Sequence, residues 1–584
     1  MITTHSLSAD AFAALASGAG DAEIVGNLRD AQLSKHLMLL HLVAEAADKA
    51  GPAATAFRAG FRLLTELQAV DPGGVAWLVG LPHIGSWTHD CLACLDEGSL
   101  PDFDYLAYAA AAAAVRIGVP FELDVPVRDG CVLLPGLGSL LVTDRCEWIR
   151  LRSDGERLRA GERIDLPSAA LIPDDGSGGE VAHWRGTPLI RAVADGRAWQ
   201  VLLEFCDRHL DRFALPMLPA MTAAEVTNWR HRIQAGWEVL VRHHGWAAEA
   251  IAAGVPVIVP LAARGDLDSA TSPAAFGAIA TSLPPSAVSM AETLVHEFQH
   301  TKLSGLMDML PLIEPGGQKA YAPWREDPRP LGGLLQGTYA FAGIVCFWNA
   351  QRRVETEPDD ILRADVLYER WRLTIEPAAS SLLGSGLLTA TGARFVTRLG
   401  EQGRALQAEP LPAAAREIAR EVALDNWLTW QLRHTALDAS GVARLAAAYR
   451  RGEPFGDQAL PDTRIEDDTR KVDSVALSRV LNMRYQDPRR YQRLGASGWP
   501  DLSAADRLLA GGNASAAAAA YRTAIDSDSQ PEAWIGLALT IHRLPDMSLR
   551  PVFAMHLPIL FDMHARLADQ GIHSDPLELA AWFA

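Results

Sequence analysis

Residues 286–303 read Ser-Ala-Val-Ser-Met-Ala-Glu-Thr-Leu-Val-His-Glu-Phe-Gln-His-Thr-Lys-Leu and form the best-defined pattern in the chain. The apolar residues that would form the buried side of a helix here are Leu294, Val295, Phe298, Leu303 and Leu306. A Pro-Pro-Ser sequence at 284–286 is a helix-start signal, and Pro311 stops a helix. The sequence therefore predicts a helix over residues 287–309.

Two histidines and a glutamate on this helix form a His-Glu-x-x-His motif. Residues four apart lie on one face of a helix, so His296 and His300 can each direct an imidazole nitrogen to one metal ion. Glu297 lies one step around, where it can reach a metal-bound water as a general base. Strand-like runs at residues 255–261 and 275–282 precede the helix, as in zinc peptidases. The alternative is a helix whose two histidines are hydrogen-bonded within a core.

A third metal ligand is harder to assign from the sequence. Residues 301–311 offer only Asp308, and no third histidine follows within the usual metzincin distance. The next predicted helix, residues 331–353, has no carboxylate in its first two turns. This is a poor fit to a zinc peptidase, which takes its third ligand from Glu, Asp or His. The strong oxygen donors in these two turns are Gln336, Thr338 and Tyr339.

Two arginines lie between prolines just before that helix, in the segment Tyr321-Ala-Pro-Trp-Arg325-Glu-Asp-Pro-Arg329-Pro. Proline restricts the backbone, and arginine can hold a carboxylate through two parallel hydrogen bonds. Arg325 and Arg329 are therefore candidate anchors for a carboxylate ligand. The alternative is a surface loop with solvated charges.

The stretch from His296 to Leu303 and the stretch from Tyr321 to Ala340 resemble the HExxH-motif peptide-modification proteins. These proteins accompany radical-SAM enzymes and short ribosomal precursor peptides in natural-product pathways. The resemblance is close over residues 275–348 and looser from the N-terminus to about residue 450. It implies an iron(II)- and 2-oxoglutarate-dependent peptide β-hydroxylase, which looks like a zinc peptidase that took up oxygenase chemistry.

The resemblance also implies residue roles. An iron oxygenase holds its metal through three protein groups and leaves three positions open, two for 2-oxoglutarate and one for dioxygen. Glu297 is then not needed as a hydrolytic base, and it binds the metal or orients water or substrate. The expected reaction is β-hydroxylation of a residue, with Asp as the candidate, in a precursor peptide. The implied metal ligands are His296, His300 and Gln336, and the implied cosubstrate-binding residues are Arg325, Arg329 and Tyr339.

Two other function classes stay open. A zinc metallopeptidase that cleaves a leader peptide would use Glu297 as its base, so Glu297→Ala would abolish hydrolysis. A non-catalytic peptide-binding scaffold would use the helical C-terminal half, and His296→Ala would leave its peptide binding intact.

The length, net charge and composition of the chain limit the classes of partner that it is expected to bind. The chain has 584 residues, too many for one core, and a formal net charge of -18, which argues against nucleic acid and anionic membranes. No stretch of about 20 residues reads as apolar enough to span a bilayer, and the N-terminus lacks a secretion pattern. Six scattered cysteines make a reducing cytoplasm the default location. The expected partner is a precursor peptide, and the resemblance adds a radical-SAM maturase as a candidate.

The predicted fold class is α+β and mostly helical, with a zincin-like metal helix beside a small sheet. The segments Leu508–Ile525 and Pro531–Ala538 resemble one tetratricopeptide unit in a helical C-terminal half. Residues 174–179 predict a loop, and His83 is expected at a plain helix start. The predicted division is 1–118 helical, 119–220 β-containing, 221–450 catalytic, 451–470 linker and 471–584 C-terminal helical.

Overall fold

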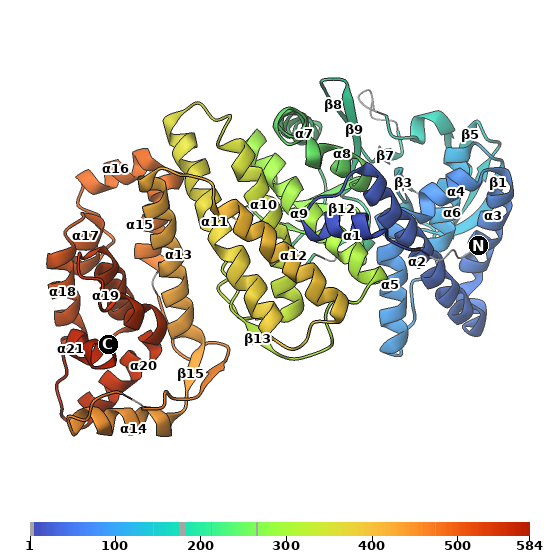
Figure 1. Ribbon diagram of the computed structural model, residues 1–584. Coiled ribbons are helices and arrows are strands. Elements are labelled where there is room, and N and C mark those ends of the chain that lie inside the picture. Colours follow the sequence, from blue (N-terminus) through green and yellow to red (C-terminus); the bar gives the residue numbers. More distant parts are fainter. Residues whose placement is uncertain are drawn as a thin grey trace. The chain divides into compact units, whose positions relative to one another are not determined.

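The computed structural model describes residues 5–143, 145–174, 182–211, 213–263, 265, 267–456, 458–473 and 475–584. The described residues are mostly helical with several small sheets (Figure 1). The chain forms two compact units, Met1–Pro311 and Leu312–Ala584. The boundary lies inside the predicted catalytic segment 221–450, so the five-part division stays a prediction.

Unit 1 begins with helices that bury small residues against one another. On α6, residues 109–114 are all alanine and all buried. Gly60 of α3 fits directly against the backbone of Leu106 and Ala107, where a Cβ atom would approach to 2.8 Å. Small residues at this contact therefore allow α3 and α6 to pack closely. The helices are α1 (Ala9–Ala16), α2 (Ala22–Lys49), α3 (Thr55–Val70), α4 (Pro72–Val79), α5 (Pro82–Asp96) and α6 (Tyr105–Ile117), with a 3₁₀ turn at Gly51–Ala54.

Two small antiparallel sheets follow the first helices. They begin with β1 at Phe121, inside the segment 119–220 that the sequence predicts to contain strands. One sheet has the order β1-β4-β5-β6 and the other the order β2-β3-β7. The strands are β1 (Phe121–Pro126), β2 (Cys131–Leu134), β3 (Gly138–Leu141), β4 (Trp148–Ser153), β5 (Arg157–Ala160), β6 (Ile164–Pro167) and β7 (Trp184–Gly186), with a 3₁₀ turn at Ser168–Leu171. The loop predicted at residues 174–179 lies outside the described residues, apart from Asp174.

A five-stranded mixed sheet completes unit 1, in the order β11-β12-β10-β9-β8. Strand β10 is parallel to β9 and β12, whereas the outer strands β8 and β11 are antiparallel to their neighbours. Every residue of β10 and β12 is buried, which explains their continuous apolar sequence. The strands are β8 (Leu189–Ala194), β9 (Arg197–Leu203), β10 (Val257–Pro260), β11 (Ser269–Ala270) and β12 (Ala278–Thr281).

Helix α9 (Ala287–Met309) packs on this sheet against β11 and β12, and it also contacts α2, α7 (Ala223–His243) and α8 (Gly245–Gly254). Its predicted bounds are confirmed. The Ser286 side chain caps the helix by accepting a hydrogen bond from the backbone N–H of Ser289 at 3.0 Å. Two glycines allow the close packing: a Cβ on Gly236 would meet Met290 at 2.5 Å, and one on Gly254 would meet Phe298 at 2.4 Å.

Unit 2 is built from helices and two short two-stranded sheets, β13–β14 and β15–β16. The predicted helix over residues 331–353 is confirmed as α10, which packs along α11 (Figure 1). Segment 451–470, predicted as a linker, contains β16, which pairs with β15. The helices are α10 (Leu331–Gln351), α11 (Pro358–Gly384), α12 (Ala390–Gln407), α13 (Ala413–His434), α14 (Ala439–Arg450), α15 (Val475–Gln486), α16 (Pro488–Ala496), α17 (Ala504–Ala510), α18 (Ala514–Ser527), α19 (Pro531–Arg543), α20 (Arg550–Asp569) and α21 (Pro576–Phe583). The strands are β13 (Lys319–Ala320), β14 (Arg329–Pro330), β15 (Thr435–Leu437) and β16 (Thr463–Ile465).

Helix α10 corrects the expectation that no stretch of about 20 residues is apolar enough to span a bilayer. Among the described residues it is the one helix long and apolar enough, by length and composition, to cross a membrane. The 18-residue apolar window of this helix is 72% buried inside the protein, as is typical of a core helix.

The predicted fold class, α+β and mostly helical, is confirmed by the many helices and the small sheets.

Candidate metal centre

The two histidines of the predicted motif direct the same ring nitrogen toward each other. His296 Nε2 and His300 Nε2 are 3.3 Å apart, and the two rings lie at 79° to one another. Both side chains are partly exposed to solvent. The protein atoms around His296, and next the neighbouring His300 ring, lower the pKa of His296 to about 3. His296 is therefore neutral at physiological pH, the form in which imidazole binds a metal.

The spacing of these nitrogens fits two ligands of one metal ion. Two nitrogens at about 2.05 Å from a tetrahedral zinc ion are about 3.3 Å apart, and for a right-angled pair the separation is about 2.9 Å. Small rotations of the two rings would change the nitrogen–nitrogen separation enough to fit either geometry. The donor pair therefore fits a divalent metal, and the same spacing also permits a direct N–H···N hydrogen bond between the rings.

Glu297 connects the metal helix to the edge of the sheet. Its side chain is 3% exposed, and its Oε1 accepts a hydrogen bond from the Ser269 hydroxyl of β11 at 2.7 Å. Thr271 also forms a side-chain hydrogen bond with this carboxyl. Burial raises the pKa of Glu297, and this effect exceeds the lowering by His300 and the two hydroxyls. The carboxyl is therefore held by the edge strand.

Two polar residues that the motif analysis did not single out hold the same helix to the N-terminus. Gln299 donates from Nε2 to the Gly18 carbonyl at 3.0 Å. Lys302, 2% exposed, donates from Nζ to the carbonyls of Gly18 and Ala19 at 2.9 and 3.0 Å. These contacts bring residues more than 280 positions apart together, so no local sequence pattern could have predicted them.

The remaining predicted ligand and its neighbour lie on α10 in unit 2. Gln336 is half-buried, and Tyr339 is 1% exposed with its ring 5.5 Å from that of Phe395. Burial raises the pKa of Tyr339 far above its usual range. The Thr338 hydroxyl donates to the Leu334 carbonyl of the same helix at 2.7 Å. Because the units are described separately, the roles of Gln336 and Tyr339 stay predictions.

Both predicted anchoring arginines pair with one aspartate of their own loop. Arg325 Nε and Arg329 donate to opposite oxygens of Asp327, each at 3.0 Å. Burial would raise the pKa of Asp327, but the hydrogen bonds from Arg329 and Arg325 outweigh it and lower the pKa. The two guanidinium groups therefore already share a carboxylate, and a bound dicarboxylate would have to use their remaining N–H donors or displace Asp327.

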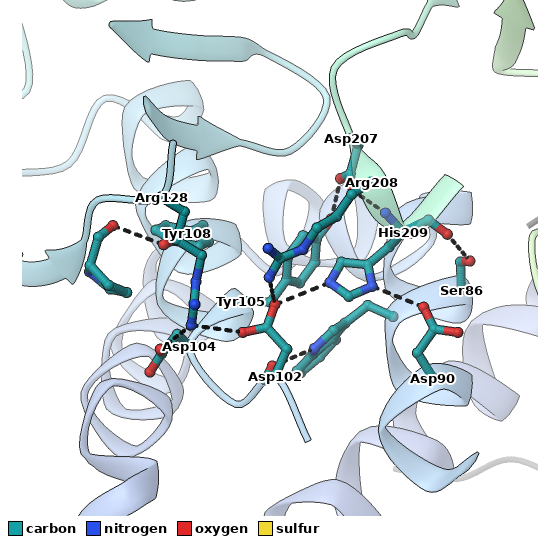
Figure 2. A network of polar contacts seen from close by, with 12 residues as sticks. Ser86, Asp90, Asp102, Asp104, Tyr105, Tyr108, Arg128, Asp207, Arg208 and His209 are labelled. Atoms are coloured by element: carbon teal, nitrogen blue, oxygen red, sulfur yellow. Dashed lines mark hydrogen bonds and ion pairs between the residues drawn. The ribbon is translucent and has the colours of Figure 1, made fainter. Parts of the chain in front are cut away.

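A second histidine cluster in unit 1 was missed by the sequence analysis. Figure 2 shows the His209 ring between two carboxylates, with Nδ1 2.9 Å from Asp90 and Nε2 3.3 Å from Asp102. Arg208 and Arg128 also pair with Asp102. Burial would lower the pKa of His209, but the hydrogen bonds with Asp102 and Asp90 outweigh it and raise the pKa to about 9. His209 is therefore a buried cation.

The network continues toward the first strands of unit 1. The Tyr105 hydroxyl donates to Asp207 at 2.5 Å, and the fully buried His83 pairs through Nε2 with Glu204 at 3.2 Å. Burial would lower the pKa of His83, but the hydrogen bond with Glu204 and the charge of Asp207 raise it. The Thr187 hydroxyl also donates to Glu204, at 3.2 Å. The expected helix start at His83 is confirmed, because Pro82 opens α5. The helix-start pattern around His83 gave no indication of its partner Glu204, which lies 121 positions further along the chain.

The described residues contain no group of three or more His, Cys, Asp and Glu side chains arranged to hold a metal. No family model matches the chain, and no curated protein matches it. The argument about function therefore depends on the geometry of the motif and on the resemblance described above.

Proposed function

We propose that this chain is an iron(II)- and 2-oxoglutarate-dependent enzyme that β-hydroxylates a residue of a ribosomal precursor peptide, with Asp as the first residue to test. The observation that carries the proposal is the 3.3 Å separation of His296 Nε2 and His300 Nε2 on one helical face. Their partial exposure leaves the pair accessible to ligands. Bound iron would activate dioxygen, the oxidant for the unactivated C–H bond, and 2-oxoglutarate would supply the other two electrons as it is oxidised to succinate and carbon dioxide.

The protein residues position and accept the reactants. His296 and His300 would each supply one imidazole nitrogen, and Gln336 remains the proposed third ligand. An amide oxygen is a weak ligand, so this metal would be held less tightly than by a facial triad with a carboxylate. Arg325 or Arg329 would bind the distal carboxylate of 2-oxoglutarate through donors that Asp327 does not occupy.

The contacts of Glu297 favour oxygenase over peptidase chemistry. A hydrolytic base must reach a metal-bound water with a free carboxylate oxygen. Here the hydroxyls of Ser269 and Thr271 both hydrogen-bond the carboxyl. We therefore propose that Glu297 is a positioning residue, which fixes α9 against the edge strand β11.

A zinc metallopeptidase that cleaves a leader peptide is the second candidate, and one observation favours it. Strand β11, at the edge of the five-stranded sheet, contacts the helix α9 that carries the motif. The edge strand β11 beside Glu297 would then hold an extended peptide along the metal. In this class Glu297→Gln would abolish turnover, whereas the proposed hydroxylase would keep part of its activity.

The test begins with metal-free protein under anaerobic conditions. Addition of iron(II) and then 2-oxoglutarate should produce a weak metal-to-ligand charge-transfer band in the visible spectrum. His296→Ala and His300→Ala should each remove the band, and His231→Ala, which changes an exposed histidine on α7, should retain it. Coexpression with a precursor peptide should add the mass of one oxygen atom to the peptide.

Other outcomes would redirect the proposal. Zinc retained through purification, no visible band and a shortened peptide would establish the peptidase instead. Peptide binding that survives His296→Ala, with no chemical change in any peptide, would establish the non-catalytic scaffold.

A further inference from the structure

Polar contacts flank the histidine-bearing face of α9 on both sides. An α-helix has 3.6 residues per turn, so each residue is rotated by about 100° from the one before it. Glu297 and Gln299 therefore lie on opposite sides of the motif histidines, each about 80° from the midpoint of the pair. Lys302 lies further around the helix, on the same side as Gln299. The face that carries His296 and His300 thus has a polar anchor on each side.

On one side, Glu297 is anchored to the edge of the five-stranded sheet. The Ser269 hydroxyl of β11 donates to its buried carboxyl at 2.7 Å. The apolar packing of α9 is non-directional, whereas a hydrogen bond specifies where a side chain must lie. This anchor fixes one point of the helix and still permits a rotation of α9 about that point. A second anchor on the other side removes this freedom.

On the other side, two buried donors converge on the turn after α1. Gln299 donates from Nε2 to the Gly18 carbonyl at 3.0 Å. Lys302 donates from Nζ to the carbonyls of Gly18 and Ala19 at 2.9 and 3.0 Å. A buried ammonium is costly unless its donors are satisfied, and hydrogen bonds from a charged group are stronger than those between neutral groups. These bonds therefore hold α9 to the turn.

The turn at Gly18 and Ala19 is shaped to accept these donors. Gly18 has a φ of 75°, which favours glycine, and a Cβ atom there would lie 3.3 Å from Gln299 Nε2. The Ala19 N–H donates to the Ala14 carbonyl at 3.0 Å, so the turn closes the C-terminal end of α1. The Lys302 ammonium lies at this end, where the helix dipole favours a positive charge.

From these contacts we infer that Gln299 and Lys302 are positioning residues of the metal centre, supported by the turn at Gly18 and Ala19. Together with Glu297 they fix the rotation of α9 about its own axis. A rotation would leave the two histidine Nε2 atoms 3.3 Å apart, but it would turn both of them relative to every metal ligand from outside the helix. The inference rests on the proposed function only in taking the motif histidines as metal ligands.

The test measures cobalt(II) binding by the full-length protein, because the visible ligand-field band of cobalt(II) depends on coordination geometry. Lys302→Met keeps most of the length of the side chain and removes its N–H donors. We expect the cobalt affinity to fall about three- to tenfold and the band to shift. This is less than the roughly 10–100-fold loss typical when a direct hydrogen-bond partner of a ligand is removed, because Lys302 acts through the helix.

A second variant and a matched control accompany this measurement. Gln299→Met removes the other donor to the Gly18 carbonyl and should change the affinity and the band in the same direction, and it carries the test if Lys302→Met does not fold. Lys35→Met is the control, because Lys35 of α2 pairs with Asp308 of the same helix at 2.8 Å, about two turns beyond the histidine pair. Its loss should leave cobalt binding unchanged.

The outcomes separate positioning from a purely structural role. A Lys302→Met protein that is less stable in urea but binds cobalt with unchanged affinity and band would overturn the inference, as would an equal loss of affinity in Lys35→Met. No cobalt binding by the unchanged protein would overturn both this inference and the proposed function. Cobalt binding as expected, without hydroxylation of any peptide, would support the positioning role and count against the proposed function alone.

Discussion

Unit 1 contains two histidine sites with opposite electrostatics. At His209 and His83, carboxylates contact the rings and raise the pKa values, to about 9 for His209. At His296, burial and then the neighbouring His300 ring lower the pKa to about 3. The same residue type therefore forms a fixed cation in one place and a neutral nitrogen donor in the other. The difference depends on whether the sequence places a carboxylate against the ring.

This comparison separates a stabilising site from a candidate reactive one. A buried cation between two carboxylates is satisfied by the protein, so it contributes to folding and leaves no capacity for a ligand. His296, which is neutral at physiological pH, faces the His300 ring, and the Nε2 atoms of both rings can serve as metal ligands. Each prediction below changes one site and asks whether the other responds.

The largest effect is expected at the charged site. His209→Ala leaves Asp90 and Asp102 without their shared cation, although Arg208 and Arg128 still compensate Asp102. We expect unit 1 to lose about 3 kcal/mol of unfolding free energy, as measured by urea denaturation. Metal affinity at residues 296 and 300 should be unchanged. A loss below about 0.5 kcal/mol would mean that the carboxylates do not depend on His209.

The reverse behaviour is expected at the neutral site. His296→Ala should weaken iron(II) or zinc binding more than 100-fold, which equals about 2.7 kcal/mol of binding free energy, in a chelator competition assay. The metal-free variant should unfold within about 1 kcal/mol of the unchanged protein, because the substitution removes a neutral, half-buried side chain. A destabilisation as large as that of His209→Ala would instead identify His296 as a structural core residue.

The charged site should also give unit 1 a pH dependence above pH 6.5, whereas His296, whose pKa is lowered to about 3, contributes one only below that value. The pKa of His209 is about 9 in the folded chain and about 6.5 when unfolded, so its stabilisation is complete below pH 6.5 and is lost as the pH rises through 9. We expect the unfolding free energy to fall by about 3 kcal/mol between pH 6.5 and 9.5. Urea titrations of the metal-free protein at both values measure this, and His209→Gln should show a flatter profile.

The smallest effect tests how the edge strand holds the metal helix. Ser269→Ala removes the hydroxyl that donates to Glu297 at 2.7 Å and should cost about 1 kcal/mol of unfolding free energy. It should leave the His209 site unaffected. Ser272→Ala, in the same loop but without a contact to Glu297, is the matched control. Equal effects of the two substitutions would show that the hydroxyl at 269 has no special role.

The sequence predicted what is local and missed what is distant. The bounds of α9 were predictable because a Pro-Pro-Ser signal opens the helix and Pro311 stops it, and the spacing of His296 and His300 followed from helix geometry alone. The His209 site was not predictable, because its carboxylates lie on α5 and before α6, more than 100 positions away. The partners of Arg325 and Arg329 could have been suspected, since Asp327 lies two residues from each.

The bonds from Gln299 and Lys302 to the Gly18 carbonyl have a consequence for synthesis on the ribosome. Translation at about 5–20 residues per second separates these partners by roughly 15–55 seconds. Over that interval the N-terminal helices lack the polar groups that fix the turn after α1, since residue 302 has not been made. The nascent chain therefore cannot complete unit 1 until more than half of the protein has been translated, and slower codons before residue 302 would lengthen the period in which α1 is exposed to chaperones and proteases.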